Sequence, residues 1–148
     1  MKPRIVRVRE LRPDQIGELV TESEQAGLRL VRRLSDDWIS GGNRFERTGE
    51  ALFAAVRAHR IVGVCGLNID PYSTSVDVGR VRHLYVLIAS RKQGIGSRLV
   101  IEVTAAARGT FNRLQLRTDD PTAAGLYERH GFRRCETDPS ATHVLDLR

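Results

Sequence analysis

The chain has 148 residues, of which 41% are hydrophobic and 28% charged, and this composition is typical of one soluble globular domain. It carries 24 basic and 18 acidic residues, a formal net charge of +6, and all but two of the basic residues are arginine. Even the longest glycine-free apolar stretches, such as Leu84–Ala89, are far shorter than the roughly 20 apolar residues of a transmembrane helix, so no membrane span or membrane partner is expected.

The same composition indicates the cellular compartment of the protein and the kinds of ligand it does not bind. Charges interrupt the first residues, which therefore do not resemble a secretory signal, and we expect a cytoplasmic protein. The two cysteines, Cys65 and Cys135, lie far apart and outside any metal-ligand spacing, so unpaired thiols and no metal are expected. The arginine bias suits a GC-rich bacterial genome. The arginines are scattered along the chain and only 5% of the residues are aromatic, which argues against a nucleic-acid-binding protein. That alternative would be tested by whether binding to nucleic acid weakens steeply with salt.

Taken in chain order, the first half of the sequence predicts a strand, two helices and three more strands. Alternating apolar and charged residues predict the first strand, Arg4–Arg9. Apolar residues at helical spacing predict one helix that opens at Pro13 and a second that carries Leu28, Leu30, Val31 and Leu34. A glycine-bearing loop at residues 40–44 precedes three apolar runs that predict strands: Ala51–Arg57, Ile61–Asp70 and Arg80–Ile88.

The second half predicts a helix, a strand, a helix and two final strands. Leu99, Val100 and Val103 recur at helical spacing, and we expect this helix to end at Gly109, where glycine would supply a left-handed cap. Asp120 followed by Pro121 predicts the start of another helix, which stops at Gly131. The remaining runs predict strands: Arg113–Arg117, Phe132–Glu136 and His143–Leu147. The sum is one α/β (α+β) domain over residues 1–148.

The segment that carries most chemical information is a strand end, Leu84–Val86, followed by a glycine-bearing turn, Arg91–Gly96, and a helix. Backbone N–H groups at a helix N-terminus are unpaired donors in a positive dipole field, and glycines let a phosphate approach the backbone. The turn therefore predicts a cradle for pyrophosphate. A tight turn into a helix would explain the two glycines equally well, because the spacing is neither that of Walker A nor that of a Rossmann turn.

Two motifs in this half of the chain occur together and in register. The first is Arg91-x-x-Gly94-x-Gly96, and the second is Asp120-x-x-Ala123-x-x-Leu126-Tyr127-x-x-x-Gly131-Phe132. Together they resemble the signatures of the GNAT superfamily of acetyl-CoA-dependent N-acetyltransferases, and the resemblance is strong from about Arg80 to Phe132. It implies a mixed, mostly antiparallel central sheet with splayed strands, flanked by helices, and acetyl-CoA as co-substrate.

The resemblance also implies roles for individual residues. The strand end would offer its backbone to the pantetheine, and the turn would hold the pyrophosphate. Val86 N–H would stabilise the developing oxyanion, and Tyr127 would protonate the leaving thiolate, although it could instead pack on its helix face. The expected cofactor-binding residues are Leu84, Tyr85, Val86, Arg91, Lys92, Gln93, Gly94, Ile95, Gly96, Ser97, Asp120 and Tyr127.

The sequence departs from the family pattern at two places. Asp120 stands where the family usually has Asn, and since an ionised carboxylate only accepts hydrogen bonds, we expect it to act mainly as a helix N-cap. The usual carboxylate base is replaced by Arg80, with Arg82 on the same strand face by alternation. The base would be a water or one of Glu50, Asp70, Asp77 and His83. Of these, His83 is better explained as a core histidine that faces away from Arg82.

The acceptor is expected to be a small-molecule or peptide amine, bound largely by the first third of the chain. The candidate residues are Trp38, Arg44, Phe45, Tyr72, Arg80 and Arg82. Trp38 and Phe45 would more readily plug the core beneath their loop than stack on an acceptor. If the three arginines converge, the acceptor would carry a carboxylate or phosphate. The predicted function is N-acetyl transfer by direct attack of the amine, in a family where homodimers are common. A sensor that binds acetyl-CoA without transferring it stays open as an alternative.

Overall fold

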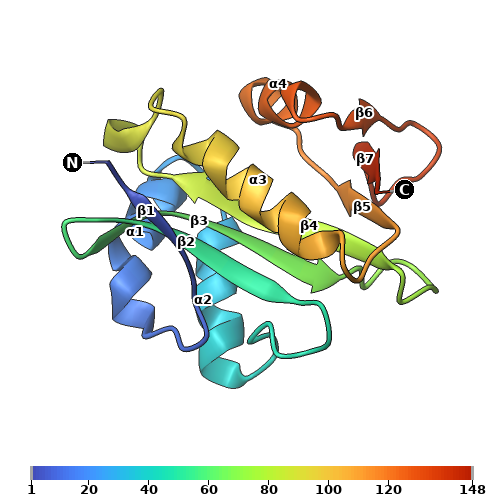
Figure 1. Ribbon diagram of the computed structural model, residues 1–148. Coiled ribbons are helices and arrows are strands. Elements are labelled where there is room, and N and C mark those ends of the chain that lie inside the picture. Colours follow the sequence, from blue (N-terminus) through green and yellow to red (C-terminus); the bar gives the residue numbers. More distant parts are fainter. Residues whose placement is uncertain (1, 148) are drawn as a thin grey trace.

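One sheet organises the chain in the computed structural model, which describes residues 2–147 (Figure 1). Within these residues the sheet has seven strands in the order β1-β2-β3-β4-β5-β7-β6. Neighbouring strands are antiparallel except for β4 and β5, which are parallel. The strands are β1 Arg4–Arg7, β2 Ala51–Arg57, β3 Arg60–Ile69, β4 Val78–Val86, β5 Arg113–Leu116, β6 Arg133–Arg134 and β7 His143–Asp146.

Helices cover both faces of the sheet. Helices α1 (Gly17–Gln25) and α2 (Leu30–Ser40) lie on one face, and α3 (Ile95–Ala107) crosses the other (Figure 1). Helix α4 (Pro121–Arg129) lies beside the β5–β7 half, and short 3-10 turns occupy Pro13–Ile16 and Ile88–Ser90. No helix within residues 2–147 is both long and apolar enough to cross a bilayer. The expected mixed, mostly antiparallel sheet flanked by helices is therefore confirmed.

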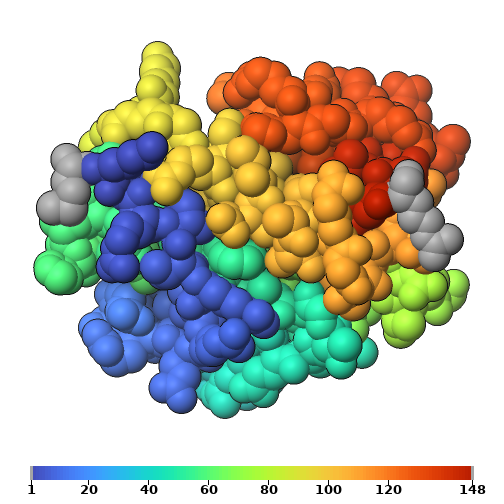
Figure 2. Space-filling model, in the orientation of Figure 1, coloured from blue at the N-terminus to red at the C-terminus, as the bar shows by residue number. Residues whose placement is uncertain are grey.

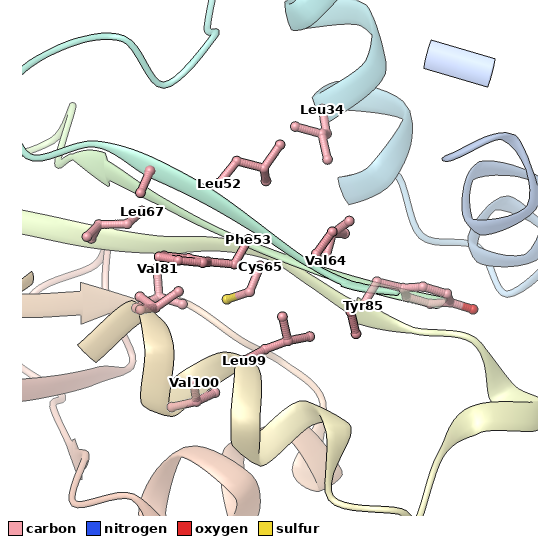
Figure 3. Packing of buried hydrophobic residues seen from close by; sticks show 14 of the residues in the cluster. Leu34, Leu52, Phe53, Val64, Cys65, Leu67, Val81, Tyr85, Leu99 and Val100 are labelled. Atoms are coloured by element: carbon pink, nitrogen blue, oxygen red, sulfur yellow. The ribbon is translucent and has the colours of Figure 1, made fainter. Parts of the chain in front are cut away.

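The core forms where the apolar stripes of the helices meet the alternating side chains of the strands. Figure 3 shows Leu34 of α2 on one side of the sheet and Leu99 and Val100 of α3 on the other, all almost completely buried. Cys65 of β3 and Val81 of β4 point toward α3. Burying side chains of this kind contributes about 1.5–3 kcal/mol each, so these two layers hold α2 and α3 against the sheet.

Strand β4 contains a bulge halfway along its length. Val64 of β3 pairs with Tyr85, but Gly66 pairs with Arg82, so two residues of β4 stand opposite Cys65 alone. One of the two is His83, whose φ of 63° is left-handed. The extra residue turns His83 toward the face of the sheet that Arg82 occupies, the face covered by α2. There His83 Nδ1 makes a hydrogen bond with Leu30 O. The expectation from simple alternation that His83 and Arg82 face opposite ways is wrong.

Several expected boundaries also differ from the structure. Helix α3 ends at Ala107, and Gly109 is not left-handed, because the N–H groups of Thr110 and Phe111 both donate to Ala107 O and continue a right-handed turn. The strand expected at Phe132–Glu136 shortens to the two residues of β6, since the chain then turns away into the β6–β7 loop. Leu28 precedes α2 and is exposed, and Trp38 lies inside α2 rather than in the following loop.

Candidate active site where two strands diverge

Strands β4 and β5 run side by side over only a short distance. Their parallel pairing covers three residue pairs, from Val78 with Arg113 to Arg80 with Gln115. Strand β4 then continues to Val86, whereas β5 ends at Leu116 with its other edge paired to β7. From Val81 to Val86, the β4 edge that faces β5 therefore has no partner strand within residues 2–147. This is the expected splay, and it leaves backbone groups available to a ligand.

The backbone of Val86 points into this gap. Leu87 N–H donates to Val62 O at 2.9 Å, and hydrogen-bonding directions alternate along a strand, so the N–H and C=O groups of Val86 point away from β3. Arg91 Nε donates to Val86 O at 2.8 Å, and its Cζ lies over the Tyr85 ring, 5.2 Å from the ring centroid. The Arg91 guanidinium thus covers the strand edge and occupies the Val86 carbonyl.

The turn before α3 presents unpaired backbone donors. The first hydrogen bond of the helix runs from Arg98 N–H to Gly94 O at 3.0 Å, so the N–H groups of Ile95, Gly96 and Ser97 have no acceptor inside the helix. Gly94 is the N-cap with a left-handed φ of 80°, a conformation that glycine adopts without strain. Three donors at the positive end of a helix form a cradle for an anion.

The second glycine of the turn is required for packing. A Cβ at Gly96 would lie 3.1 Å from Leu126 Cδ2, whereas a Cβ at Gly94 would meet nothing within 4 Å. The small residue at position 96 therefore lets α4 approach the start of α3. Figure 2 shows the segment before α3 (yellow) standing out from the surface next to α4 and the β6–β7 region (orange to red).

Most side chains of the turn are engaged with protein. Ser97 Oγ lies 3.0 Å from His130 Nε2 at the end of α4, which ties the two helices together. Gln93 Oε1 accepts a hydrogen bond from Arg57, and Ile95 is buried in the core. Lys92 is exposed in a left-handed conformation with φ of 62°. Apart from the exposed Lys92 side chain, the turn therefore offers free groups to a ligand through its backbone.

A carboxylate that the sequence analysis missed fixes the end of β4. Glu22 Oε1, on α1, accepts hydrogen bonds from Tyr85 Oη at 2.7 Å and from Ile88 N–H at 2.8 Å. Burial, with a further contribution from the Glu22 carboxylate, raises the pKa of Tyr85 to about 12. The Tyr85 side chain is therefore a structural anchor, and only its backbone belongs to the strand edge. No local pattern connects Glu22 with residues more than sixty positions away.

Tyr127 lies buried on α4, with its ring edge against Phe132 at a centroid distance of 5.5 Å. Burial raises the pKa of Tyr127 well above its usual value, and the nearby Cys65 raises it further. The Cys65 thiol is itself fully buried, and burial raises its pKa to about 12. Both groups therefore keep their protons at neutral pH, so Tyr127 is a neutral phenol and Cys65 a neutral thiol.

Asp120 has the N-cap role that was expected of it. Its carboxylate accepts the Thr122 N–H at 3.0 Å, and Pro121 occupies the first turn of α4. The Asp120 N–H in turn donates to Thr118 Oγ1 at 3.2 Å. The carboxylate is thus used to begin α4 and hence to place Tyr127, two turns further along.

The expected acceptor residues do not form one pocket. Trp38 and Phe45 stack on each other at 6.4 Å and are both buried, so they plug the core. Arg44 donates to Trp38 O at 2.8 Å and to Ile39 O at 3.4 Å, which satisfies carbonyls at the C-terminus of α2. Arg44 and Phe45 also border a cavity of about 580 Å³ beside the C-terminal end of α3, at the opposite end of that helix from the turn.

Arg80 is committed to structure rather than to a ligand. Its guanidinium forms a buried ion pair with Asp70 at 3.2 Å, donates to Ser140 O and lies 4.7 Å from the centroid of the exposed Tyr72 ring. It thus links the β3–β4 turn to the β6–β7 loop. Arg82 lies two residues further along β4, on the same face, and its one polar side-chain contact within residues 2–147 is with Asn68 Oδ1 at 3.5 Å. The three arginines therefore do not converge as the sequence analysis considered.

The candidate bases are also mostly occupied. Glu50 is buried and accepts hydrogen bonds from the Asn68 side chain and the backbone N–H groups of Ile69 and Arg47. Since Leu30 O can only accept, the neutral His83 ring carries its proton on Nδ1, and its buried Nε2 has no hydrogen-bond partner within residues 2–147. Burial, and then the charge of Arg82, lower the pKa of His83 to about 4. The expected buried, hydrogen-bonded histidine is thus found.

Comparison with known proteins identifies a matching protein family and similar solved structures. The family described as "Acetyltransferase (GNAT) domain" matches residues 48–134. Among solved structures, a protein of Exiguobacterium sp. 255-15 described as an acetyltransferase is 28% identical with a TM-score of 0.84, over 99% of this chain and 94% of that one. The GNAT family N-acetyltransferase YhbS of Escherichia coli, solved in complex with CoA, is 19% identical with a TM-score of 0.76, over 100% of this chain and 83% of that one. The GNAT domain of PAT from S. lividans is 14% identical with a TM-score of 0.78, over 97% of this chain and 90% of that one. The last two likenesses show the fold alone.

Proposed function

The chain belongs to the GNAT acetyltransferase family, and we propose that it moves an acetyl group from acetyl-CoA to a primary amine by direct attack of that amine. The observation that carries this proposal is the opening between β4 and β5 beside the unpaired N-terminus of α3. A strand edge and an anion cradle that adjoin each other fit the amides and the pyrophosphate of one extended molecule.

Binding would rely on the backbone. The N–H groups of Ile95, Gly96 and Ser97 would hold the pyrophosphate, and the C=O group of Val86 would accept a hydrogen bond from a pantetheine amide. Arg91 donates to the same Val86 carbonyl, so this side chain would have to release it when a ligand amide takes its place. The released guanidinium would then be free to approach the phosphates.

The chemistry would be shared between a few groups of this chain. Bound acetyl-CoA supplies the activated thioester carbonyl. Val86 N–H would donate to the carbonyl oxygen as negative charge develops there. Tyr127, which keeps its proton at neutral pH, would deliver it to the departing sulfur. Because Glu50 and Asp70 are engaged and His83 Nε2 is buried, a water would take the proton that the amine loses.

Release of CoA thiol in the presence of a panel of primary amines tests this function. We expect thiol release that requires both acetyl-CoA and an amine, with the acetylated amine identified by mass spectrometry. The proposal fails if acetyl-CoA binds tightly but no amine in the panel is acetylated, since that result would identify a sensor instead.

A further inference from the structure

Arg82 is an incompletely compensated cation close to the gap between β4 and β5. It is half-buried on β4, immediately before the bulge, and faces α2. Its contact with Asn68 Oδ1 is 3.5 Å long, which is at the outer limit for a hydrogen bond. Within residues 2–147 it forms no ion pair. Arg80, on the same face of the same strand, instead has a buried carboxylate partner in Asp70.

The neighbouring carboxylates are already used elsewhere. Asp70 is paired with Arg80 at 3.2 Å, and Glu50 accepts hydrogen bonds from the Asn68 side chain and the Ile69 N–H, each at 3.0 Å. Arg33 on α2 adds a second positive charge, since both it and Arg82 act electrostatically on the ring of His83. Asp70 and Glu50, the carboxylates at the neighbouring part of β3, are therefore engaged with groups other than Arg82.

A half-buried guanidinium loses part of its hydration, and this cost is recovered when an anion pairs with it. The planar fork of arginine suits the two oxygens of a carboxylate or a phosphate. Arg82 precedes the strand end Leu84–Val86 on the same strand, so an anion held by it would lie next to the gap but on the α2 side of the sheet. A ligand there would be distinct from one whose pyrophosphate lies at the N-terminus of α3.

We propose that Arg82 recognises an anionic group on the acceptor, so that the acceptor is an amine that also carries a carboxylate or a phosphate. This inference rests on the proposed acetyl transfer and names its substrate class. Arg82 is then a specificity-determining residue. Arg82 faces α2 by alternation with Arg80, and the bulge that follows turns His83 to the same side.

Calorimetric titration with succinate and, separately, inorganic phosphate tests the site without turnover. The protein is titrated both free and saturated with CoA, so that phosphate binding at the α3 turn is blocked in the second series. We expect the wild type to bind at least one anion and Arg82→Gln to bind it about tenfold more weakly. Arg108→Gln, which removes an exposed charge at the end of α3, should bind like the wild type. Equal binding by Arg82→Gln, or no binding by the wild type at tens of millimolar, would overturn the proposal.

Matched acceptors test the same idea by activity. L-Alanine is compared with alaninamide, and phosphoethanolamine with ethanolamine, so that each pair differs in one anionic group. We expect at least one anionic member to be preferred by about tenfold or more in kcat/KM, and Arg82→Gln to lose that preference while Arg108→Gln keeps it. The pair that shows the preference identifies carboxylate or phosphate. Equal kcat/KM within both pairs would contradict the inference but leave acetyl transfer itself in place. Transfer to no amine would contradict the proposed function, and the titration would then still decide whether Arg82 binds an anion.

Discussion

Replacing Glu22 by alanine should loosen the end of β4 from α1. The substitution removes the acceptor of two hydrogen bonds, from Tyr85 Oη at 2.7 Å and Ile88 N–H at 2.8 Å. A hydrogen bond to a charged group is worth about 1.5–3 kcal/mol, and the solvent exposure of the Ile88 bond places it at or below the lower end of that range. We therefore expect Glu22→Ala to lower the free energy of unfolding by about 2–3 kcal/mol, a fall in Tm of about 4–12 °C in a chain of this size.

Urea unfolding followed by circular dichroism measures this effect, with two companion variants. Tyr85→Phe removes one of the two bonds and should cost about 1.5–2 kcal/mol, and the double variant should cost less than the sum of the single ones, because the two residues interact. Glu102→Ala removes an exposed carboxylate from α3 and should stay within about 0.5 kcal/mol of the wild type. A Glu22→Ala variant as stable as Glu102→Ala would refute the claim that Glu22 holds the end of β4 against α1.

Three further predictions concern buried groups. Asp70→Asn leaves Arg80 buried without a counter-charge and should cost about 3–5 kcal/mol in urea unfolding; a loss below about 1 kcal/mol would show that the ion pair is dispensable. Tyr127→Phe should still bind acetyl-CoA in calorimetry but lower kcat by about 10²-fold or more, and an unchanged kcat would exclude the general-acid role. The pKa of His83 is lowered in the fold from 6.5 to about 4, so the unfolded chain binds the extra proton and stability should fall as pH drops from about 6.5 toward 4. His83→Asn, which tolerates a left-handed φ, should have a flatter dependence of the urea midpoint on pH over this range, and an unchanged slope would contradict the assignment.

Much of the fold follows from local patterns in the sequence. The spacing of apolar residues shows which side chains a single element must bury, as in helices α2 and α3 and in strands β2–β4. The element order could therefore be predicted without tertiary information. The cap at Asp120 followed by Pro121 is likewise a local signal, and the structure uses it as expected. The two spaced motifs identified the family for the same reason, because both lie within continuous stretches of chain.

The details that the sequence could not predict depend on contacts across the chain. One extra residue in β4 breaks the period-two alternation, and only the pairing with β3 reveals it, so His83 was placed on the wrong face. Glu22 meets Tyr85 across the α1–β4 contact, which no spacing rule detects. Arg80 stands where a carboxylate base was expected, and its partners Asp70 and Ser140 come from two separate loops. Side-chain partners of this kind depend on the assembled fold rather than on local propensity.

The central claim is that the turn before α3 binds acetyl-CoA, and calorimetric titration of acetyl-CoA tests it most directly. The wild type is compared with Gly94→Glu, which introduces a carboxylate among the free N–H groups of the cradle. The new Cβ would have open space around it, but the left-handed φ of 80° strains any side chain there, so the fold of this variant is checked as well. Gly109→Glu adds the same charge beyond the far end of α3, also in open space, and serves as the control. The account predicts one site in the wild type and in Gly109→Glu, and loss of binding in Gly94→Glu while its thermal unfolding still shows a folded protein. No binding to the wild type at millimolar acetyl-CoA, or wild-type affinity in a folded Gly94→Glu, would contradict it.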